Sequence, residues 1–187
     1  MIVVADTGPI HYLVLSGFIG TLHDLYGVVV LPEAVRDELS HPAAPAEIRA
    51  WIAALPSWVS VRTPGGETGL ERLGPAEREA LQLALEMRAD LVLIDESLAR
   101  RIAAEHYIAV KGTLGVLEEA AQKLNLDLAS AVRRLRQTGI YLDEKTIAGA
   151  LERDRVRREQ QRAQESRPDC NGAHLVRKTN GLSNLYC

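Results

Sequence analysis

The chain has 187 residues, 47% hydrophobic and 25% charged, which suits one domain with its own hydrophobic core plus an appendage and excludes wholesale disorder. Its only cysteines, Cys170 and Cys187, exclude a disulfide scaffold and a four-cysteine zinc site. The net charge of −3 divides into +3 over residues 151–187 (8 basic, 5 acidic) and −6 over the first 150 (14 basic, 20 acidic), and so acidic a body is not a passive phosphate binder.

Short runs of β-branched and aliphatic residues alternate along the chain with segments of helical periodicity. We expect buried strands at residues 2–4, 28–30, 59–61, 91–94 and 108–110. We expect helices at residues 9–17, 32–40, 46–55, 75–88, 97–105, 113–124 and 127–137. Strands that are apolar on both faces and alternate with helices predict a parallel α/β sheet covered by helices on both sides.

The composition changes toward the end of the chain. Asp143 is a candidate cap for one more helix, and we interpret residues 143–164 as a C-terminal helix. No periodicity remains beyond it, so residues 165–187 are predicted to be a flexible tail and residues 1–142 the folded domain. No apolar run approaches the roughly 18 residues that a membrane span needs, and no basic leader precedes the first apolar run, so we expect a cytoplasmic protein without membrane contact.

Two aspartates directly follow predicted strands, Asp6 after the first and Asp95 after the fourth. In open α/β sheets the ligand crevice lies beyond the carboxyl ends of the strands, where the strand order reverses. The two carboxylates would share that crevice if their strands are neighbours. The alternative is helix capping, by Asp6 or Thr7 at one helix and by Asp95 or Ser97 at another.

Helix geometry singles out Glu77 within residues 75–88. At 100° per residue, Glu77 lies in the middle of the apolar stripe, where a carboxylate costs several kcal/mol unless it is paired or metal-bound. The alternative is that Glu77 closes a capping box, although Gly74 at the cap position lacks the hydroxyl for the reciprocal bond. The opposite face, expected to meet solvent, carries Glu79, Gln82 and Glu86.

A fourth acid, Glu38, falls inside the apolar arc of residues 32–40, unless its side chain simply reaches water from the edge of that arc. The acids Asp6, Glu38, Glu77 and Asp95 are therefore expected to converge. Like charges raise one another's pKa unless a cation intervenes, and carboxylates with water are the ligands of Mg²⁺ or Mn²⁺. Such an ion activates water and neutralises charge during phosphodiester hydrolysis.

Four stretches carry a family resemblance: VVADTGPIHYLVLSG, LPEAVRDEL, LGPAEREALQLALEMRADLVLIDESLAR and IAVKGTLGVLEEA. Spread over residues 1 to about 150, and in this order, they resemble the PIN-domain ribonucleases. The chain looks most like a prokaryotic PIN-like subfamily of predicted nucleic-acid-binding proteins, and it also resembles the VapC-type toxin ribonucleases. The resemblance implies a three-layer α/β/α sandwich with a central parallel sheet, and a ribonuclease that uses Mg²⁺ or Mn²⁺.

The resemblance also implies roles for individual residues. The catalytic acids would be Asp6, Glu38, Glu77 and Asp95. Of these, Asp6, Glu77 and Asp95 would bind the metal, and Glu38 would complete or orient the shell. The chain departs from the subfamily at Ala76, where glycine is usual before the third acid, and at Lys111, where a small hydroxyl residue is frequent.

Candidate substrate-binding residues are Thr7, Arg100, Lys111 and Thr113. Lys111 would contact a phosphate or pair with one of the acids and lower the affinity for metal. Thr113 would bind phosphate or cap the helix that it opens. Arg100 would hold the scissile phosphate or remain solvated at the surface.

These observations predict a metal-dependent endoribonuclease. The resemblance further implies the toxin of a type II toxin–antitoxin pair, with RNA as substrate, a small antitoxin protein as partner and a homodimer as one assembly. The alternative is a catalytically silent PIN-like nucleic-acid-binding or scaffold subunit. A metal-dependent DNA nuclease is a third hypothesis. Because the chain has only eight aromatic residues, a platform on which successive bases stack is not expected.

Overall fold

The computed structural model describes residues 1–66, 70 and 72–165. The chain divides into a compact unit of residues 1–154 and a second unit of residues 155–187. Within the second unit, the described residues are helical, with an ion pair between Arg155 and Glu159 at 2.7 Å. Residues 166–187 of the predicted tail lie outside the described residues.

The described residues form a five-stranded parallel sheet with the strand order β3-β2-β1-β4-β5. The strands are β1 (Val3–Ala5), β2 (Val29–Pro32), β3 (Val59–Arg62), β4 (Leu91–Leu93) and β5 (Val110–Lys111). The chain runs outward from β1 to β3, then crosses back to place β4 and β5 on the other side of β1. The strand order therefore reverses between β1 and β4, and the parallel sheet predicted from the sequence is confirmed.

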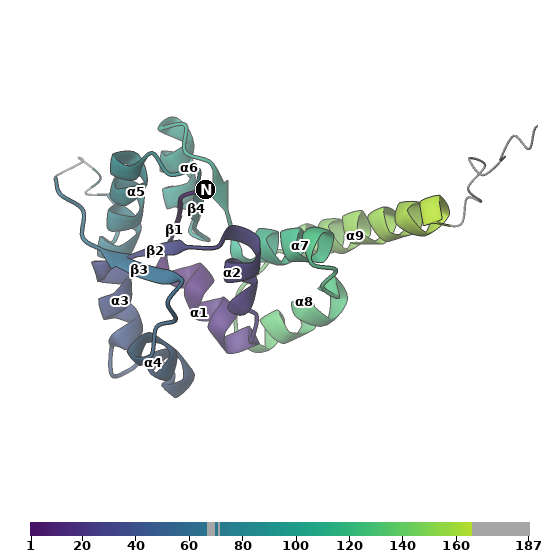
Figure 1. Cartoon of the computed structure of the whole chain (residues 1–187), viewed down its shortest axis with the longest axis horizontal. Coiled ribbons are helices and arrows are strands. Elements are labelled where there is room, and N and C mark those ends of the chain that lie inside the picture. The colour runs from purple at the N-terminus through teal and green to yellow at the C-terminus, as the bar shows by residue number, and fades with distance from the viewer. Residues whose placement is uncertain (67–69, 71, 166–187) are drawn as a thin grey trace, which may run out of the picture. The chain divides into compact units, whose positions relative to one another are not determined.

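Helices cover both faces of this sheet (Figure 1). They are α1 (Thr7–Ser16), α2 (Gly20–Tyr26), α3 (Glu33–Ser40), α4 (Ala46–Ala53), α5 (Pro75–Met87), α6 (Ser97–Glu105), α7 (Thr113–Lys123), α8 (Leu128–Gln137) and α9 (Glu144–Glu165). Successive strand residues face opposite sides. Val3 and Ala5 join one core with α1, α2, α7 and α8, while Val4 joins a second core with α5 and α6. This is the predicted three-layer α/β/α sandwich.

Helix α2 has no counterpart among the helices predicted from the sequence. Its seven residues carry only Leu22 and Tyr26 on the buried side, one turn apart. Two apolar positions are too few to show a helical period, and Ile19 at the N-cap position offers no capping side chain. The helix packs against α7, so tertiary contacts stabilise a helix whose local sequence signals are weak.

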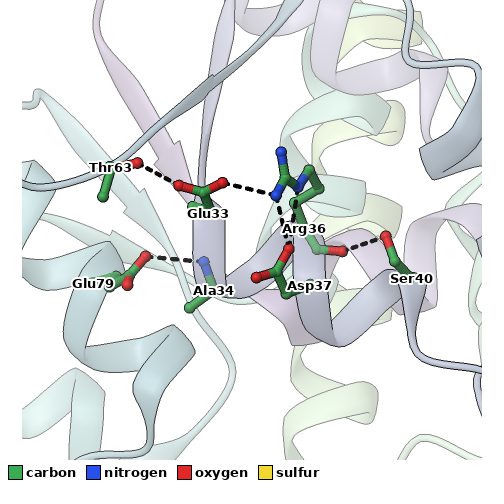
Figure 2. A network of polar contacts seen from close by, with 7 residues as sticks. All are labelled: Glu33, Ala34, Arg36, Asp37, Ser40, Thr63 and Glu79. Atoms are coloured by element: carbon green, nitrogen blue, oxygen red, sulfur yellow. Dashed lines mark hydrogen bonds and ion pairs between the residues drawn. The ribbon is translucent and has the colours of Figure 1, made fainter.

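Helix α5 buries more of its surface than the sequence predicted. It packs against α3 as well as against the sheet and α6, so two of its faces are covered. Glu79 is half-buried and accepts the backbone N–H of Ala34 at 2.9 Å, at the start of α3 (Figure 2). Gln82 is only 4% exposed. The prediction that Glu79 and Gln82 face solvent is therefore wrong, whereas Glu86 is exposed as expected.

Helix α9 begins at the predicted place. Asp143 accepts the N–H of Thr146 at 3.0 Å, the capping contact expected for it. Within the first unit, Ile147 and Ala150 are buried in the same core as α7 and α8. In the part of the chain that the structure describes, no helix combines the length and the apolar character needed to cross a membrane.

Candidate active site

The four predicted acids are among six acidic residues that line one cleft of about 660 Å³ at the carboxyl edge of the sheet; the other two are Glu96 and Glu118. Asp6 follows β1, Asp95 lies two residues beyond β4, and α3 and α5 contribute Glu38 and Glu77. Because β1 pairs directly with β4, the two aspartates leave the same edge where the strand order reverses. The structure thus brings all four predicted acids to one cleft, while their catalytic role stays a prediction.

Asp6 is the most deeply buried of the four, at 5% exposure. Burial raises the pKa of its carboxyl to about 7, and the negative charges of Glu77 and Glu38 add to that rise against the opposing influence of the Thr7 backbone N–H. Its Oδ1 has no hydrogen-bond partner among the described residues. A buried oxygen of this kind is costly unless a proton or a cation satisfies it.

Hydrogen bonds do not support the capping alternatives. Asp6 stands at the N-cap position of α1 but makes no capping bond with its side chain. Glu96, rather than Asp95, caps α6 by accepting the N–H of Ala99 at 2.9 Å. Among the described residues, no hydrogen bond joins Glu77 to the N-cap residue of α5, so the capping box is not formed.

Asp95 is held by the start of α7. Its Oδ1 accepts the backbone N–H of Thr113 at 2.8 Å, and its Oδ2 accepts the Thr113 hydroxyl at 2.5 Å. Thr113 is fully buried, and the N-cap position of α7 belongs to Gly112. A Cβ on Gly112 would lie 2.7 Å from Asp95 Oδ1 and 3.1 Å from Arg100 Nη1, so glycine lets both side chains approach here. Thr113 orients Asp95 instead of capping its own helix.

Glu38 is exposed but tied to the cleft by one hydrogen bond. The Thr7 hydroxyl donates to Glu38 Oε2 at 2.7 Å, which links the start of α1 to α3. The exposure of Glu38 agrees with the alternative that its side chain reaches water. The bond nevertheless keeps its carboxylate beside the residue that follows Asp6.

Arg100 and Lys111 bring positive charge to the cleft. Lys111 forms an ion pair with Glu119, which also accepts the Tyr26 hydroxyl at 2.6 Å and pairs with Lys123 at 2.7 Å. Burial raises the pKa of Glu119, but the hydrogen bonds from Lys111, Lys123 and Tyr26 outweigh it and lower that pKa to about 2. Lys111 is thus paired with an acid outside the four, and the expected alternative of a pair with a site carboxylate is not seen.

Sequence reasoning missed several residues that line the cleft: Tyr12, Glu96, Glu118, Ile140, Tyr141 and Leu142. The last three lie in the connection between α8 and α9. The sequence marks this connection only by Gly139, which adopts φ +82°, and by the cap at Asp143. Those signals place a turn but do not say which cleft the turn borders.

The donor set suits a hard divalent cation, because all four side chains are carboxylates and Asp6 offers an unpaired buried oxygen. As they stand, no three Asp, Glu, His or Cys side chains within residues 1–66, 70 and 72–165 are close enough to share an ion. Asp95 is turned to Thr113, and Glu38 to Thr7. The residues fit Mg²⁺ or Mn²⁺ in chemistry, and binding would require these side chains to converge.

A family model described as a PIN domain matches residues 2–155. The match covers most of the chain and ends at the boundary of the compact unit, so the chain belongs to the PIN-domain family. PIN domains are generally nucleases, act on nucleic acid and typically use divalent metal ions. A search of curated proteins and a search of solved structures gave no match.

Proposed function

We propose that the protein is a divalent-metal-dependent endoribonuclease. The observation that carries the proposal is the buried, unpaired Oδ1 of Asp6 in a cleft lined by five more acidic residues, Glu38, Glu77 and Asp95 among them. Asp6, Glu77 and Asp95 would hold Mg²⁺ or Mn²⁺, with Glu38 completing or orienting the shell. When bound, the ion lowers the pKa of a water molecule and neutralises charge that develops on the phosphate.

The contacts of the remaining polar groups support a role for each in this reaction. Thr113 holds both oxygens of Asp95 and so limits its rotation, and Thr7 does the same for one oxygen of Glu38. Arg100 and Lys111 would bind the phosphate, which an otherwise acidic body would repel. Glu119 anchors Lys111 at the edge of the cleft, and this anchoring limits how far its ammonium reaches.

A catalytically silent nucleic-acid-binding or scaffold subunit is the second candidate. It is favoured by the separation of the carboxylates, since no three of them are positioned to share an ion among the described residues. In that case Asp95 would serve mainly to cap α7 through Thr113. The two candidates differ in whether a divalent ion binds and whether a strand is cut.

The decisive assay is cleavage of structured RNAs, and of DNA strands of the same sequence, with Mn²⁺ or with EDTA. We expect RNA to be cut with Mn²⁺, to survive with EDTA, and to survive with Asp6→Asn under both conditions. DNA cleavage at a similar rate would replace the ribonuclease by a general nuclease. Binding without cleavage on every substrate would favour the silent subunit.

In the cell, we propose that the protein is the toxin of a type II toxin–antitoxin pair, with a small antitoxin protein as partner. The support is the resemblance of residues 1 to about 150 to the PIN-domain ribonucleases, which further implies a VapC-type toxin. Induced expression should arrest bacterial growth, and expression of a small protein encoded beside this gene should relieve the arrest. Growth arrest of equal strength with Asp6→Asn would contradict a toxin that acts through this cleft.

A further inference from the structure

Tyr141 is the large side chain at the cleft that the fold itself does not use. It is 91% exposed, yet it borders the same cleft as Asp6 and Asp95. Its neighbours Ile140 and Leu142 both pack against the larger core, so the backbone on either side is anchored. Tyr141 therefore lies at the border of the cleft on an anchored segment, with a side chain that is almost wholly exposed and contributes little to the core.

The ends of this segment are also tied down. The Thr138 hydroxyl donates to the carbonyl of Leu135 at 2.6 Å, and Asp143 caps α9 by accepting the N–H of Thr146 at 3.0 Å. A ring on a mobile loop would lose conformational freedom on binding a ligand. A ring on an anchored segment loses less, so this position is suited to a contact with substrate.

An isolated exposed aromatic residue needs no explanation by itself, and the chain contains a second example. Tyr107, between α6 and β5, is 99% exposed and does not line the cleft. The two tyrosines are similarly exposed, and although Tyr107 has a positive φ of 58°, only Tyr141 lies beside the four acids. Tyr107 is thus a matched control for Tyr141.

The lining of the cleft indicates what the Tyr141 ring would meet. Apolar and aromatic groups of the α8–α9 connection share the cleft with the carboxylates and with Arg100 and Lys111. A ligand that combines an apolar planar ring with a phosphate matches both parts, and a nucleotide is such a ligand. In a duplex each base already stacks on its neighbours, so only an unpaired base has a face free for an aromatic side chain.

We propose that Tyr141 stacks on one unpaired base of a strand bound in the acidic cleft and so contributes to the affinity of the site for that strand. This inference rests on the proposed function in that the bound ligand is a nucleic acid. A single ring is not a platform for successive bases, and its contribution is that of one base. Removing the ring should therefore weaken binding of a single strand by about 5- to 150-fold.

The test measures binding of short fluorescently labelled strands by anisotropy, in an Asp6→Asn background that keeps the strand intact. The probes are a single-stranded RNA, its DNA counterpart and an RNA duplex of the same sequence. Tyr141→Ala should bind both single strands more weakly by the stated factor, Tyr141→Phe should keep the affinity, and Tyr107→Ala should change nothing. Binding of the duplex should be the same in all variants.

Three results would overturn the inference: Tyr141→Ala binding like Tyr107→Ala, Tyr141→Phe losing as much affinity as Tyr141→Ala, or no binding of any strand. A cleavage assay on the protein with an intact Asp6 tests the proposed nuclease function separately from the stacking contact. Tyr141-dependent binding without cleavage in Mn²⁺ would remove the nuclease and leave the stacking contact. Cleavage of single strands and duplexes alike, unchanged by Tyr141→Ala, would remove the stacking contact and leave the nuclease.

Discussion

At Asp6, the negative charge that would bind a metal ion also lowers the stability of the fold. Its carboxyl has a pKa near 7 in the fold, above its ordinary value of 3.8, because burial disfavours the charge. A raised pKa of an acid means that its contribution to stability is fully present below about pH 4 and is lost as the pH rises through about 7.

Asp6→Asn should therefore raise the free energy of unfolding at pH 8 in EDTA. The gain is at most about 4 kcal/mol, which corresponds to the rise of the Asp6 pKa from 3.8 to about 7. The gain should shrink toward pH 4, where the wild-type carboxyl is also neutral. Urea denaturation across this pH range measures it, and a loss of stability at pH 8 would contradict the account. The same substitution should abolish metal-dependent cleavage.

Glu77 and Glu79 lie two residues apart on α5 and should behave oppositely. Glu77 lines the cleft, so Glu77→Gln should reduce cleavage by orders of magnitude and leave the melting temperature nearly unchanged. Glu79 accepts an N–H of the first turn of α3, at Ala34, so Glu79→Ala should cost about 1 kcal/mol of stability and spare cleavage. Loss of cleavage with Glu79→Ala, but not with Glu77→Gln, would contradict these assignments.

Glu79→Gln is the conservative control for that pair. The amide oxygen can still accept the N–H of Ala34, and only the negative charge at the start of α3 is removed. Its effect on stability should stay within about 0.5 kcal/mol, because the hydrogen bond is kept and only a charge near a helix N-terminus is lost. A much larger loss would mean that the charge, more than the hydrogen bond, stabilises α3.

Local rules were enough to single out the four acids, because each either follows a strand or interrupts an apolar arc. The contacts that orient them were not predictable in this way. Thr7 meets Glu38 across 31 positions, and Thr113 meets Asp95 across 18. Outside the four acids, the contact of Glu79 with Ala34 across 45 positions was equally unpredictable. Periodicity describes the face of one element and carries no information about which other element packs against it.

Among the elements, α7 is connected to β5 and α2 by one carboxylate. Glu119 binds Lys111 at the end of β5, Tyr26 at the end of α2, and Lys123 within its own helix. Its pKa is lowered to about 2 from 4.5. For an acid with a depressed pKa, the stabilising contribution is present above about pH 4.5 and is lost as the pH falls through about 2.

Glu119→Gln should accordingly destabilise the protein at pH 7, by on the order of 2 kcal/mol, since charge-assisted hydrogen bonds to a half-buried group are lost. The difference from wild type should narrow below pH 4.5 and vanish near pH 2. Chemical denaturation at several pH values measures this. Glu159→Gln, which breaks an exposed pair with Arg155, is the control and should change stability little. A pH-independent effect of Glu119→Gln would contradict the assigned cause.

The first four strands were predictable from short apolar runs, and the long helices from a helical period of apolar positions. The fifth strand was expected at 108–110 but lies at Val110–Lys111, where only Val110 is apolar. Helix α5 was placed within one residue of its ends, at Pro75–Met87. The burial of Gln82 on this helix was not predicted. Its side chain donates to the carbonyl of Gly66 and to Glu86, and an amide whose donors are satisfied can be buried among apolar neighbours. A pattern based on hydrophobicity assigns any amide to solvent.

For the whole molecule, the reversal of strand order between β1 and β4 creates the cleft. Alternating strands and helices predict a parallel sheet, but many strand orders satisfy that pattern. The order follows from which strand each helix returns to, and this depends on packing over the entire domain. The cleft could therefore be predicted only on the condition that β1 and β4 are neighbours.

Among the residues that the structure describes, those of the two cores lie between Val3 and Leu151. Deleting residues 166–187 should consequently leave the melting temperature and cleavage unchanged, because no described core contact is removed. Calorimetry and the cleavage assay on the shortened chain measure both. A clear fall in melting temperature would show that the deleted segment contributes to the stability of the folded domain.

Binding of a divalent ion by the cleft is the step on which the nuclease and the silent subunit differ, and thermal melting with Mn²⁺ tests it most directly. An ion that binds only the folded cleft stabilises it by roughly 2.7 kcal/mol at 100 times its Kd. The melting temperature of the wild-type chain should rise with Mn²⁺ relative to EDTA, and that of Asp6→Asn should not. An unchanged wild-type midpoint up to millimolar Mn²⁺, or an equal rise in Asp6→Asn, would contradict a metal site built on Asp6.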